Sequence, residues 1–554
     1  MNKIFKDAIR RKKFQRNGLN CILFGLAAFS SQAREGQGKQ QHPNILFIAV
    51  DDLKPILGCY GDQLVKTPNI DNLARQGTVF LQNYCQQAVC GPTRASLMTG
   101  MRPDYTRVWD LKTKMRDVNP EILSLPQYFI SMGYQTAGIG KIYDPRCVDE
   151  QLDKPSWSIP YFKKSDKYYP ASTGSPEGQY QNPETKVQIR KYNAEVQAKS
   201  MTGKELADFA GPSFKPSVEC MDVPDNAYSD GANTLHAKEI LARLAKEEKP
   251  FFFAVGLTKP HLPFVAPKKY WDLYERDKMP LAPFQQKAKD SPDMAYHTAA
   301  ELYAYSDIPD ISSFSDQKVG LDLPVSKQKE LIHGYYAATS YTDANVGVLL
   351  HALDSLGLTK NTIIVLWGDH GWHLGDHNLW CKHTNFEQAT HAPLIISAPW
   401  IKPSQTKSPT EFIDIFPTLC ELTGISVPVH LHGKSLVEVM KNPKTMVKDY
   451  SVSQYPRTLD KLDTERLGWS DGQYMGYSLR TAQYRYTIWM KDSYRSSKPY
   501  RKDLVVATEL YDYMKDPNET VNVANDKNYA NVLKNLNSKM IDFLNLQNFK
   551  LSHK

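Results

Sequence analysis

A cysteine, a proline and an arginine stand close together in residues 90–100, which read CGPTRASLMTG. Pro92 suits the first turn of a helix, where its missing N–H leaves no hydrogen bond unmade. Cys90 would then lie at the helix N-terminus, where unpaired backbone N–H groups favour anions. Arg94 adds a planar guanidinium group that pairs well with an oxyanion. This stretch indicates a nucleophile beside an anion site; the alternative is a buried structural cysteine before an ordinary helix.

Acidic residues follow two apolar runs that are typical of buried strands. Residues 44–50 lead into Asp51 and Asp52, and residues 362–367 lead into Asp369. In open α/β sheets, ligands bind beyond the carboxyl ends of the parallel strands. We therefore expect these carboxylates at a ligand site, although an adjacent Asp pair alone also suits an ordinary strand-to-loop turn.

Further elements must position these side chains. We expect strands at residues 136–139 and 251–256, and a helix over residues 328–356, where apolar residues recur at helical spacing. Strands alternating with helices predict an α/β fold with a largely parallel sheet. Residues 146–235 and 275–325 are polar without clear periodicity, which favours loops and short helices there.

The two ends of the chain differ from its middle. Residues 1–33 combine a basic start, an apolar run and small residues before Ala33, a layout typical of a secretory signal peptide. A membrane anchor is the alternative, but the apolar run is too short to span a bilayer. Residues 34–43 predict a disordered leader. We expect a catalytic domain at 44–440 and a C-terminal α+β subdomain at 445–554, with antiparallel strands before a final helix.

Charge and cysteine content narrow the classes of partner. The net charge of the 554-residue chain is +8, and seven Lys and Arg residues against one Asp lie in the first 33 residues. The remainder is close to neutral, so the charge balance gives no reason to expect a nucleic acid partner. After residue 33 no stretch reads as transmembrane, so we expect no stable membrane insertion. Besides Cys21 and Cys90, six cysteines allow 15 disulfide pairings, among which the sequence does not choose. Export would place the mature protein in the periplasm or outside the cell.

The motif in residues 90–100 resembles the signature of type I sulfatases, C-x-P-[ST]-R-x-x-L-x-T-G. In that family a maturation enzyme converts the cysteine to formylglycine, whose hydrated aldehyde attacks the sulfate ester and later expels sulfate. The resemblance implies the same conversion of Cys90. It also implies an alkaline-phosphatase-like fold, with a large, mostly parallel sheet between helices and a smaller C-terminal subdomain of antiparallel sheet and helix.

Several short segments look like the iduronate-2-sulfatase branch of the family, and the resemblance covers most of residues 43–525. Examples are residues 51–55 (DDLKP), 259–264 (KPHLPF) and 369–375 (DHGWHLG). Many bacterial polysaccharide sulfatases are similar to that branch too. The resemblance therefore implies removal of sulfate from a sulfated carbohydrate derived from a polysaccharide. A uronate 2-O-sulfatase acting on glycosaminoglycan fragments is the alternative.

The resemblance also assigns roles to matching positions in this chain. One calcium ion is implied, with carboxylates suited to a hard cation, and its ligand positions hold Asp51, Asp52, modified Cys90, Asp369 and His370. The positions that neutralise the sulfate and hold the formylglycine are filled by Arg94, Lys141 and Lys382. His261 fills the position that protonates the leaving alcohol, which suits its near-neutral ordinary pKa. Nitrogen is a poor calcium ligand, so we expect His370 to bind weakly.

One position departs from the branch, which has a His three residues after the lysine at 141, whereas this chain has Asp144. A free carboxylate ~4 Å from another anion costs about 4 kcal/mol at an effective dielectric constant of about 20. We therefore expect Asp144 to point away, to pair with Arg146 or Lys141, or to accept from a sugar hydroxyl. On this argument the recognised sugar edge is neutral and rich in hydroxyls, and 2-O-sulfated iduronate is the runner-up.

Two other classes of function remain open. A phosphatase or phosphodiesterase of the same superfamily would need a Ser or Thr nucleophile and usually several zinc ligands, which the motif around Cys90 opposes. A carbohydrate-binding protein on an inactive scaffold would be compatible with Asp144, but the other matched positions are intact. Turnover of an aryl sulfate would separate these classes.

Overall fold

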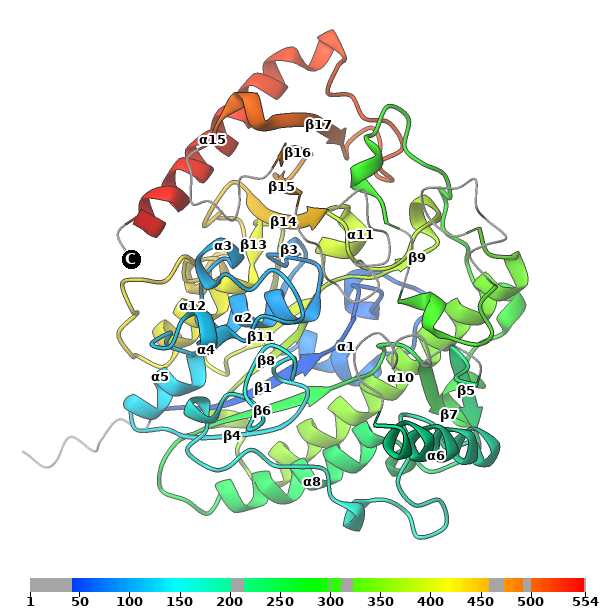
Figure 1. Ribbon diagram of the computed structural model, residues 1–554. Coiled ribbons are helices and arrows are strands. Elements are labelled where there is room, and N and C mark those ends of the chain that lie inside the picture. The colour runs from blue at the N-terminus through cyan, green and yellow to red at the C-terminus, as the bar shows by residue number, and fades with distance from the viewer. Residues whose placement is uncertain are drawn as a thin grey trace, which may run out of the picture. The chain divides into compact units, whose positions relative to one another are not determined.

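The apolar runs of the sequence form the centre of a seven-stranded sheet (Figure 1). The computed structural model describes residues 42–200, 214–297, 299, 301–309, 322–457, 473–491 and 500–552. In spatial order the strands are β12 Ser404–Thr406, β2 Thr78–Phe80, β11 Leu394–Ser397, β8 Thr362–Gly368, β1 Asn44–Val50, β6 Phe251–Leu257 and β4 Gln135–Gly140.

The sheet is mostly parallel. Four adjacent strands run parallel to one another: β8, β1, β6 and β4. β12 is parallel to β2, whereas β11 is antiparallel to both of its neighbours, β8 and β2. The predicted α/β fold with a largely parallel sheet is confirmed. β1, β6 and β8 are buried along their whole length, as expected for parallel strands covered on both faces.

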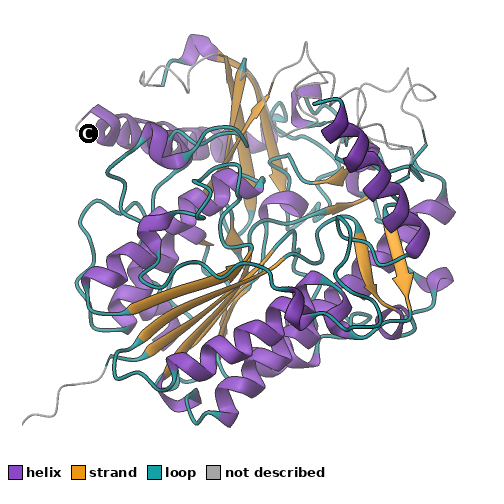
Figure 2. Cartoon of the chain, turned by 60° about the horizontal axis from the view of Figure 1, so that its bottom comes forward, coloured by secondary structure: helices purple, strands orange, loops and turns teal. Residues whose placement is uncertain are grey.

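Helices cover both faces of this sheet, as Figure 2 shows. Leu46 and Ile48 of β1 point to one face, where they share an apolar core with α1 Pro68–Ala74, α8 Ser229–Leu244 and α10 Val325–Ser355. Ile45 and Phe47 point to the other, where they pack with α2 Cys90–Thr99, α5 Leu125–Ser131 and α12 Ile415–Leu422. Alternation along one strand thus divides the core into two layers.

A helix of 16 residues, α6 Pro183–Ala198, lies where the sequence predicted loops and short helices. The side chain of Asn182 begins it by accepting hydrogen bonds from two backbone N–H groups, at 3.0 and 3.1 Å. α6 buries only two of its side chains and therefore carries no apolar stripe that would reveal its period. The prediction for residues 146–235 is wrong in this segment and at the start of α8, which begins at Ser229.

The C-terminal segment forms a second, antiparallel sheet of four strands: β14 Ser451–Arg457, β15 Tyr474–Arg480, β16 Tyr484–Lys491 and β17 Val505–Asp512. The final helix, α15 Ala530–Ser552, lies along this sheet (Figure 1). Its Leu536, Met540 and Phe543 pack against Met475 and Leu479 of β15. The predicted antiparallel strands and final helix are confirmed.

Short elements complete the described residues. Paired strands are β3 Asn83–Tyr84 with β13 Thr410–Glu411, β5 Val218–Met221 with β7 Phe264–Pro267, and β9 His373–Leu374 with β10 Trp380–Cys381. Short helices are α3 Pro103–Thr106, α4 Met115–Val118, α9 Lys268–Trp271, α11 Glu387–Thr390 and α13 Val437–Lys441. None of the helices in the described residues has the length and apolar content that a membrane crossing requires. The predicted signal peptide, residues 1–33, lies outside the described residues.

Candidate active site

The carboxyl ends of four adjacent parallel strands supply most of the predicted site residues. β1 is followed by Asp51 and Asp52, β8 by Asp369 and His370, β4 by Lys141, and β6 by the loop that carries His261. Strand order β8–β1–β6–β4 brings these ends together at one edge of the sheet. This is the edge at which open α/β sheets bind ligands.

Two glycines let β4 and β6 approach closely beside Lys141. Gly140 has φ +80°, and a Cβ atom there would lie 2.0 Å from the Gly256 carbonyl oxygen. A Cβ atom on Gly256 would lie 2.2 Å from the backbone of Lys141. Neither position has room for a side chain, and the Lys141 N–H donates to the Gly256 carbonyl at 3.1 Å. The strand pair therefore fixes where the Lys141 side chain starts.

Cys90 is the first residue of α2, as the motif predicted. Its Sγ atom lies 3.4 Å from His370 Nε2, 3.8 Å from Lys141 Nζ and 3.9 Å from Asp52 Oδ1. Burial raises the pKa of this thiol well above its usual range. A thiol held protonated is a poor nucleophile.

Arg94 is fully buried and its guanidinium group joins two of the carboxylates. Nε donates to Asp369 Oδ2 at 3.0 Å, and Nη2 donates to Asp51 Oδ1 at 2.9 Å. Nη1 donates to the Ile142 carbonyl at 3.0 Å, and the group stacks 5.4 Å from the centre of the Trp367 ring. Arg94 thus holds the strand ends of β1 and β8 in register, with its donors occupied by protein acceptors.

Two lysines carry the remaining positive charge. Lys141 pairs with Asp51, and Lys382 Nζ lies 2.9 Å from both carboxylate oxygens of Asp52. Burial alone would raise the pKa of Asp51, but Lys141 and the neighbouring cations hold it well below its usual range. Burial and the adjacent carboxylates, by contrast, hold the pKa of Asp52 well above its usual range despite Lys382. Burial and neighbouring negative charge therefore disfavour the ionised form of Asp52.

His261 points its Nε2 atom towards two carboxylates. Its Nδ1 lies 2.6 Å from the Leu262 carbonyl oxygen, which places the proton of the neutral ring on Nδ1. Nε2 lies 3.2 Å from Glu301 Oε1 and 3.7 Å from Asp52 Oδ2. Burial lowers the pKa of His261. A proton on Nε2 would have Glu301 as its partner, in the position from which a leaving alcohol could be protonated.

Sequence reasoning missed Glu301. This carboxylate contacts Lys382 at 3.2 Å as well as His261. It lies in the polar stretch of residues 275–325, which has no periodicity and no motif that would have singled it out. Lys259 was also missed; its buried Nζ donates to the carbonyl groups of His261 and Pro263 at 2.6 and 2.7 Å. It therefore fixes the loop that carries His261.

The donor set fits a divalent cation. One ligand atom from each member of two overlapping groups lies within 4.8 Å of the others: Asp52, Cys90, Asp369 and His370, and Asp51, Asp52, Cys90 and His261. His370 Nδ1 lies 3.0 Å from the Gly371 carbonyl oxygen, so the Nε2 lone pair of the neutral ring faces Asp52 Oδ1 at 3.3 Å. Carboxylate oxygens and a ring nitrogen that converge in this way could hold a divalent cation.

Asp144 is buried and paired with Arg146. Oδ1 accepts from Arg146 Nε at 2.9 Å, and Oδ2 accepts from Nη2 at 2.8 Å. Burial would raise the pKa of Asp144, but the guanidinium group and Lys141 lower it to about 2. One of the expected arrangements is therefore present. The pair cancels the repulsion on which the expectation of a neutral sugar edge was based.

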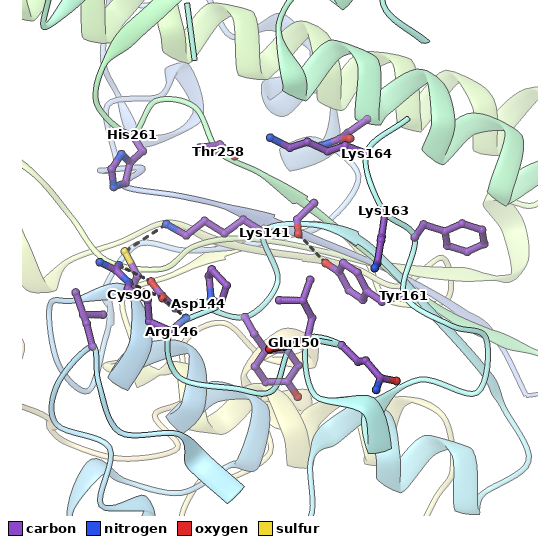
Figure 3. A pocket seen from close by; sticks show the side chains of 18 of the residues that line it. Cys90, Lys141, Asp144, Arg146, Glu150, Tyr161, Lys163, Lys164, Thr258 and His261 are labelled. Atoms are coloured by element: carbon purple, nitrogen blue, oxygen red, sulfur yellow. Dashed lines mark hydrogen bonds and ion pairs between the residues drawn. The ribbon is translucent and has the colours of Figure 1, made fainter. Parts of the chain in front are cut away.

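A cavity of about 1090 Å³ opens onto these residues. Its wall includes all of the following: Cys90, Lys141, His261, Glu301 and Lys382. Figure 3 shows Cys90, Lys141 and His261 at one end, with Asp144 and Arg146 below them. The predicted nucleophile, both lysines predicted to bind sulfate, and the predicted acid therefore face a common space.

Comparisons with known proteins agree with this geometry. The family model described as Sulfatase matches residues 43–425, and the model of the N-sulphoglucosamine sulphohydrolase C-terminal region matches residues 375–545. The chain is 33% identical to iduronate 2-sulfatase of Mus musculus, over 91% of this chain and 95% of that one, and 33% identical to the Homo sapiens protein, over 92% and 97%. The solved structure of BT4656 in complex with its substrate D-glucosamine-2-N,6-O-disulfate has a TM-score of 0.66 at 20% identity, over 92% and 98%.

Proposed function

Since this chain belongs to the sulfatase family and is a sulfuric ester hydrolase, we propose that it cleaves sulfate esters of a polysaccharide-derived oligosaccharide through formylglycine made from Cys90. The position of Cys90 Sγ carries this proposal. Cys90 begins a helix and lines the cavity, and its Sγ atom lies within 3.9 Å of a lysine, a histidine and a carboxylate. The hydrated aldehyde would supply an oxygen nucleophile where the protonated thiol is inert.

The residues of this chain would divide the work as follows. Lys141 and Lys382 line the cavity and would neutralise the sulfate group, while buried Arg94 holds the carboxylates in place. His261 would have to take up a second proton, on Nε2 beside Glu301, before it could give that proton to the departing sugar oxygen. Positive charge and a proton donor thus stand on the side of the cavity where the ester would lie.

We propose calcium as the metal, held by Asp51, Asp52, Asp369 and His370 together with modified Cys90. Carboxylate oxygens are the ligands that calcium prefers, and three Asp carboxylates stand together at this end of the sheet. A bound divalent cation would polarise the sulfate and lower the repulsion among the carboxylates.

Turnover assays test the proposal. Wild-type protein made with a maturation enzyme should hydrolyse 4-nitrophenyl sulfate or a sulfated oligosaccharide, and Cys90→Ala should not. A parallel assay with 4-nitrophenyl phosphate addresses the phosphatase alternative. Absence of sulfate release from a panel of glycosaminoglycan and algal oligosaccharides would favour the inactive binding scaffold instead.

A uronate 2-O-sulfatase acting on glycosaminoglycan fragments is the second candidate. The mouse and human relatives are iduronate 2-sulfatases, and the pair between Arg146 and Asp144 removes the repulsion that disfavoured an acidic sugar. Direct comparison of 2-sulfated uronate disaccharides with neutral-sugar sulfates separates the two candidates.

We also propose that the protein is exported to the periplasm or the medium, because residues 1–33 have the three-part layout of a signal peptide. N-terminal sequencing of the exported protein should begin near Arg34. Recovery of exported protein that still begins at Met1 would overturn this proposal.

A further inference from the structure

The cavity extends from Cys90 to a pair of lysines that the proposed chemistry does not use. Tyr161, Lys163 and Lys164 line the same cavity as Cys90. In Figure 3, Lys163 and Lys164 lie on the side opposite Cys90, and Lys141 runs between the two sides. The volume of about 1090 Å³ exceeds the ~300–1,000 Å³ of ordinary small-molecule pockets. There is room for more than one sulfated sugar.

Two anchored aromatic rings, Trp157 and Tyr161, also line the cavity and are called the aromatic wall here; in Figure 3, Tyr161 lies beside Lys163. The Tyr161 hydroxyl donates to the Gly140 carbonyl at 2.7 Å, and Trp157 Nε1 donates to the Leu152 carbonyl at 2.7 Å. The ring centres are 5.1 Å apart. A Cβ atom on Gly138 would lie 2.4 Å from the Tyr161 ring, so the glycine lets the ring press against β4. The C–H faces of a pyranose ring pack well on such rings.

The two lysines differ from Lys141, Arg146 and Lys382 of the same cavity, because no ion pair is recorded for them among the described residues. Three cations of the wall are committed to buried carboxylates: Lys141, Arg146 and Lys382. The recorded hydrogen bond of Lys164 Nζ is to Ser229 Oγ at 3.4 Å, and its charge also acts on buried Asp230, whose pKa it lowers. Lys154 and Glu150 also line the cavity and offset one another in charge. The far end therefore carries an excess of positive charge.

We propose that Lys163 and Lys164 bind a second anionic group of the substrate, carried on a sugar next to the one whose ester is cleaved. This rests on the proposed function and names its substrate class: an oligosaccharide with at least two anions, the scissile sulfate at Cys90 and a sulfate or carboxylate at the lysine pair. The aromatic wall supports the sugar rings between them. Long, hydrated lysine side chains at an exposed site suit a group that binds by charge rather than by fixed geometry.

A charge-matched pair of variants tests this. Lys163→Gln/Lys164→Gln removes the proposed cations, and Lys246→Gln/Lys249→Gln removes the same charge from exposed positions outside the cavity wall. With a dianionic oligosaccharide at low salt, the first variant should raise KM about five- to tenfold, an effect that shrinks as salt is added. Its kcat, and its kcat/KM for 4-nitrophenyl sulfate, should match those of the control. Equal KM values for the two variants on every dianionic probe would overturn the proposal.

A binding measurement separates this proposal from the function on which it rests. In the Cys90→Ala background, calorimetry with one oligosaccharide bearing a distal sulfate and one bearing a distal carboxylate should show weaker binding on loss of the two lysines for at least one probe. The probe affected identifies the anion. Lysine-dependent binding without turnover by the wild-type protein would contradict the sulfatase substrate but support the anion site. Turnover by the wild-type protein, together with binding of both probes that does not depend on the lysines, would support the sulfatase substrate and contradict the anion site.

Discussion

At the scale of a single residue, the environment of Cys90 leads to a prediction about its proposed conversion to formylglycine. Burial raises the pKa of the thiol, so an unmodified cysteine stays protonated at neutral pH and attacks poorly. We expect turnover to rise in proportion to the fraction of protein in which Cys90 is formylglycine. Mass spectrometry of the peptide that contains residue 90, on preparations made with and without a maturation enzyme, measures that fraction. Full turnover from protein whose Cys90 is entirely a thiol would contradict the expectation.

The pair between Asp144 and Arg146 gives a second prediction at this scale. Arg146→Gln leaves a buried carboxylate without its bidentate partner, so we expect stability to fall by about 1–3 kcal/mol. We also expect KM for anionic substrates to rise, because the unpaired carboxylate faces the cavity. Asp144→Asn/Arg146→Gln should recover most of the stability, and a double-mutant cycle in urea measures the coupling. Additive effects of the two single changes would show that the pair contributes nothing.

Motifs predicted individual residues only where the chemistry is local in sequence. Cys90, Arg94 and the strand-end acids meet as their spacing indicated, because each follows a recognisable helix start or apolar run. Glu301 could not be found in this way, since its role comes from a loop that folds back over the site and contacts Lys382 and His261. The sequence left several arrangements of Asp144 open, and pairing with Arg146, two residues away, is the one found in the structure.

Secondary structure was predictable where burial imposed a pattern on the sequence. β1 has the predicted bounds because all seven of its residues are buried and apolar contacts cover both faces. α6 was missed because only two of its 16 side chains are buried, which leaves no apolar period to detect. The burial of an element against the rest of the chain, rather than its length, decided whether sequence reasoning could find it.

β17 carries a buried carboxyl group that predicts how stability depends on pH. Burial raises the pKa of Glu509 from 4.5 to about 7, although Trp489 and Tyr511 donate hydrogen bonds to it at 2.8 and 2.7 Å. An unfolded chain releases this proton near its ordinary pKa, so the folded state binds more protons between pH 4.5 and about 7. The contribution of this group to stability therefore falls across that window, by about 3 kcal/mol in total.

We expect Glu509→Gln to remove this fall, because a neutral amide mimics the protonated acid. The melting temperature of the variant should exceed that of the wild type at pH 8 and approach it near pH 4.5. Differential scanning fluorimetry across this range measures the difference, with exposed Glu121→Gln as the control. A difference between variant and wild type that does not change with pH would contradict the prediction.

At the scale of the whole described unit, buried ion pairs tie the C-terminal sheet to the large one. Glu387 of α11 pairs with Arg480 of β15 and Arg485 of β16, and Arg485 also pairs with Glu519 at 2.9 Å. Removing one side of such a network leaves buried charge without a partner, which is strongly destabilising. The two parts of the sequence on either side of the predicted boundary near residue 440 therefore share one network of ion pairs. Through α11, the C-terminal segment supports the site indirectly.

Metal binding should stabilise this whole unit, because its ligands come from the ends of both β1 and β8. Asp52 is the proposed ligand whose pKa is raised well above its usual range by burial and neighbouring carboxylates, so a cation bound there would relieve that repulsion. At a calcium concentration a hundred times the dissociation constant, binding adds about 2.7 kcal/mol to the stability.

The melting temperature should therefore rise when calcium is added back after exhaustive chelation. Asp52→Asn should abolish that rise, exposed Asp277→Asn should keep it, and magnesium should give a smaller one, since it demands a tighter octahedral site. Identical melting curves with calcium and with chelator would show that these residues do not form a calcium site.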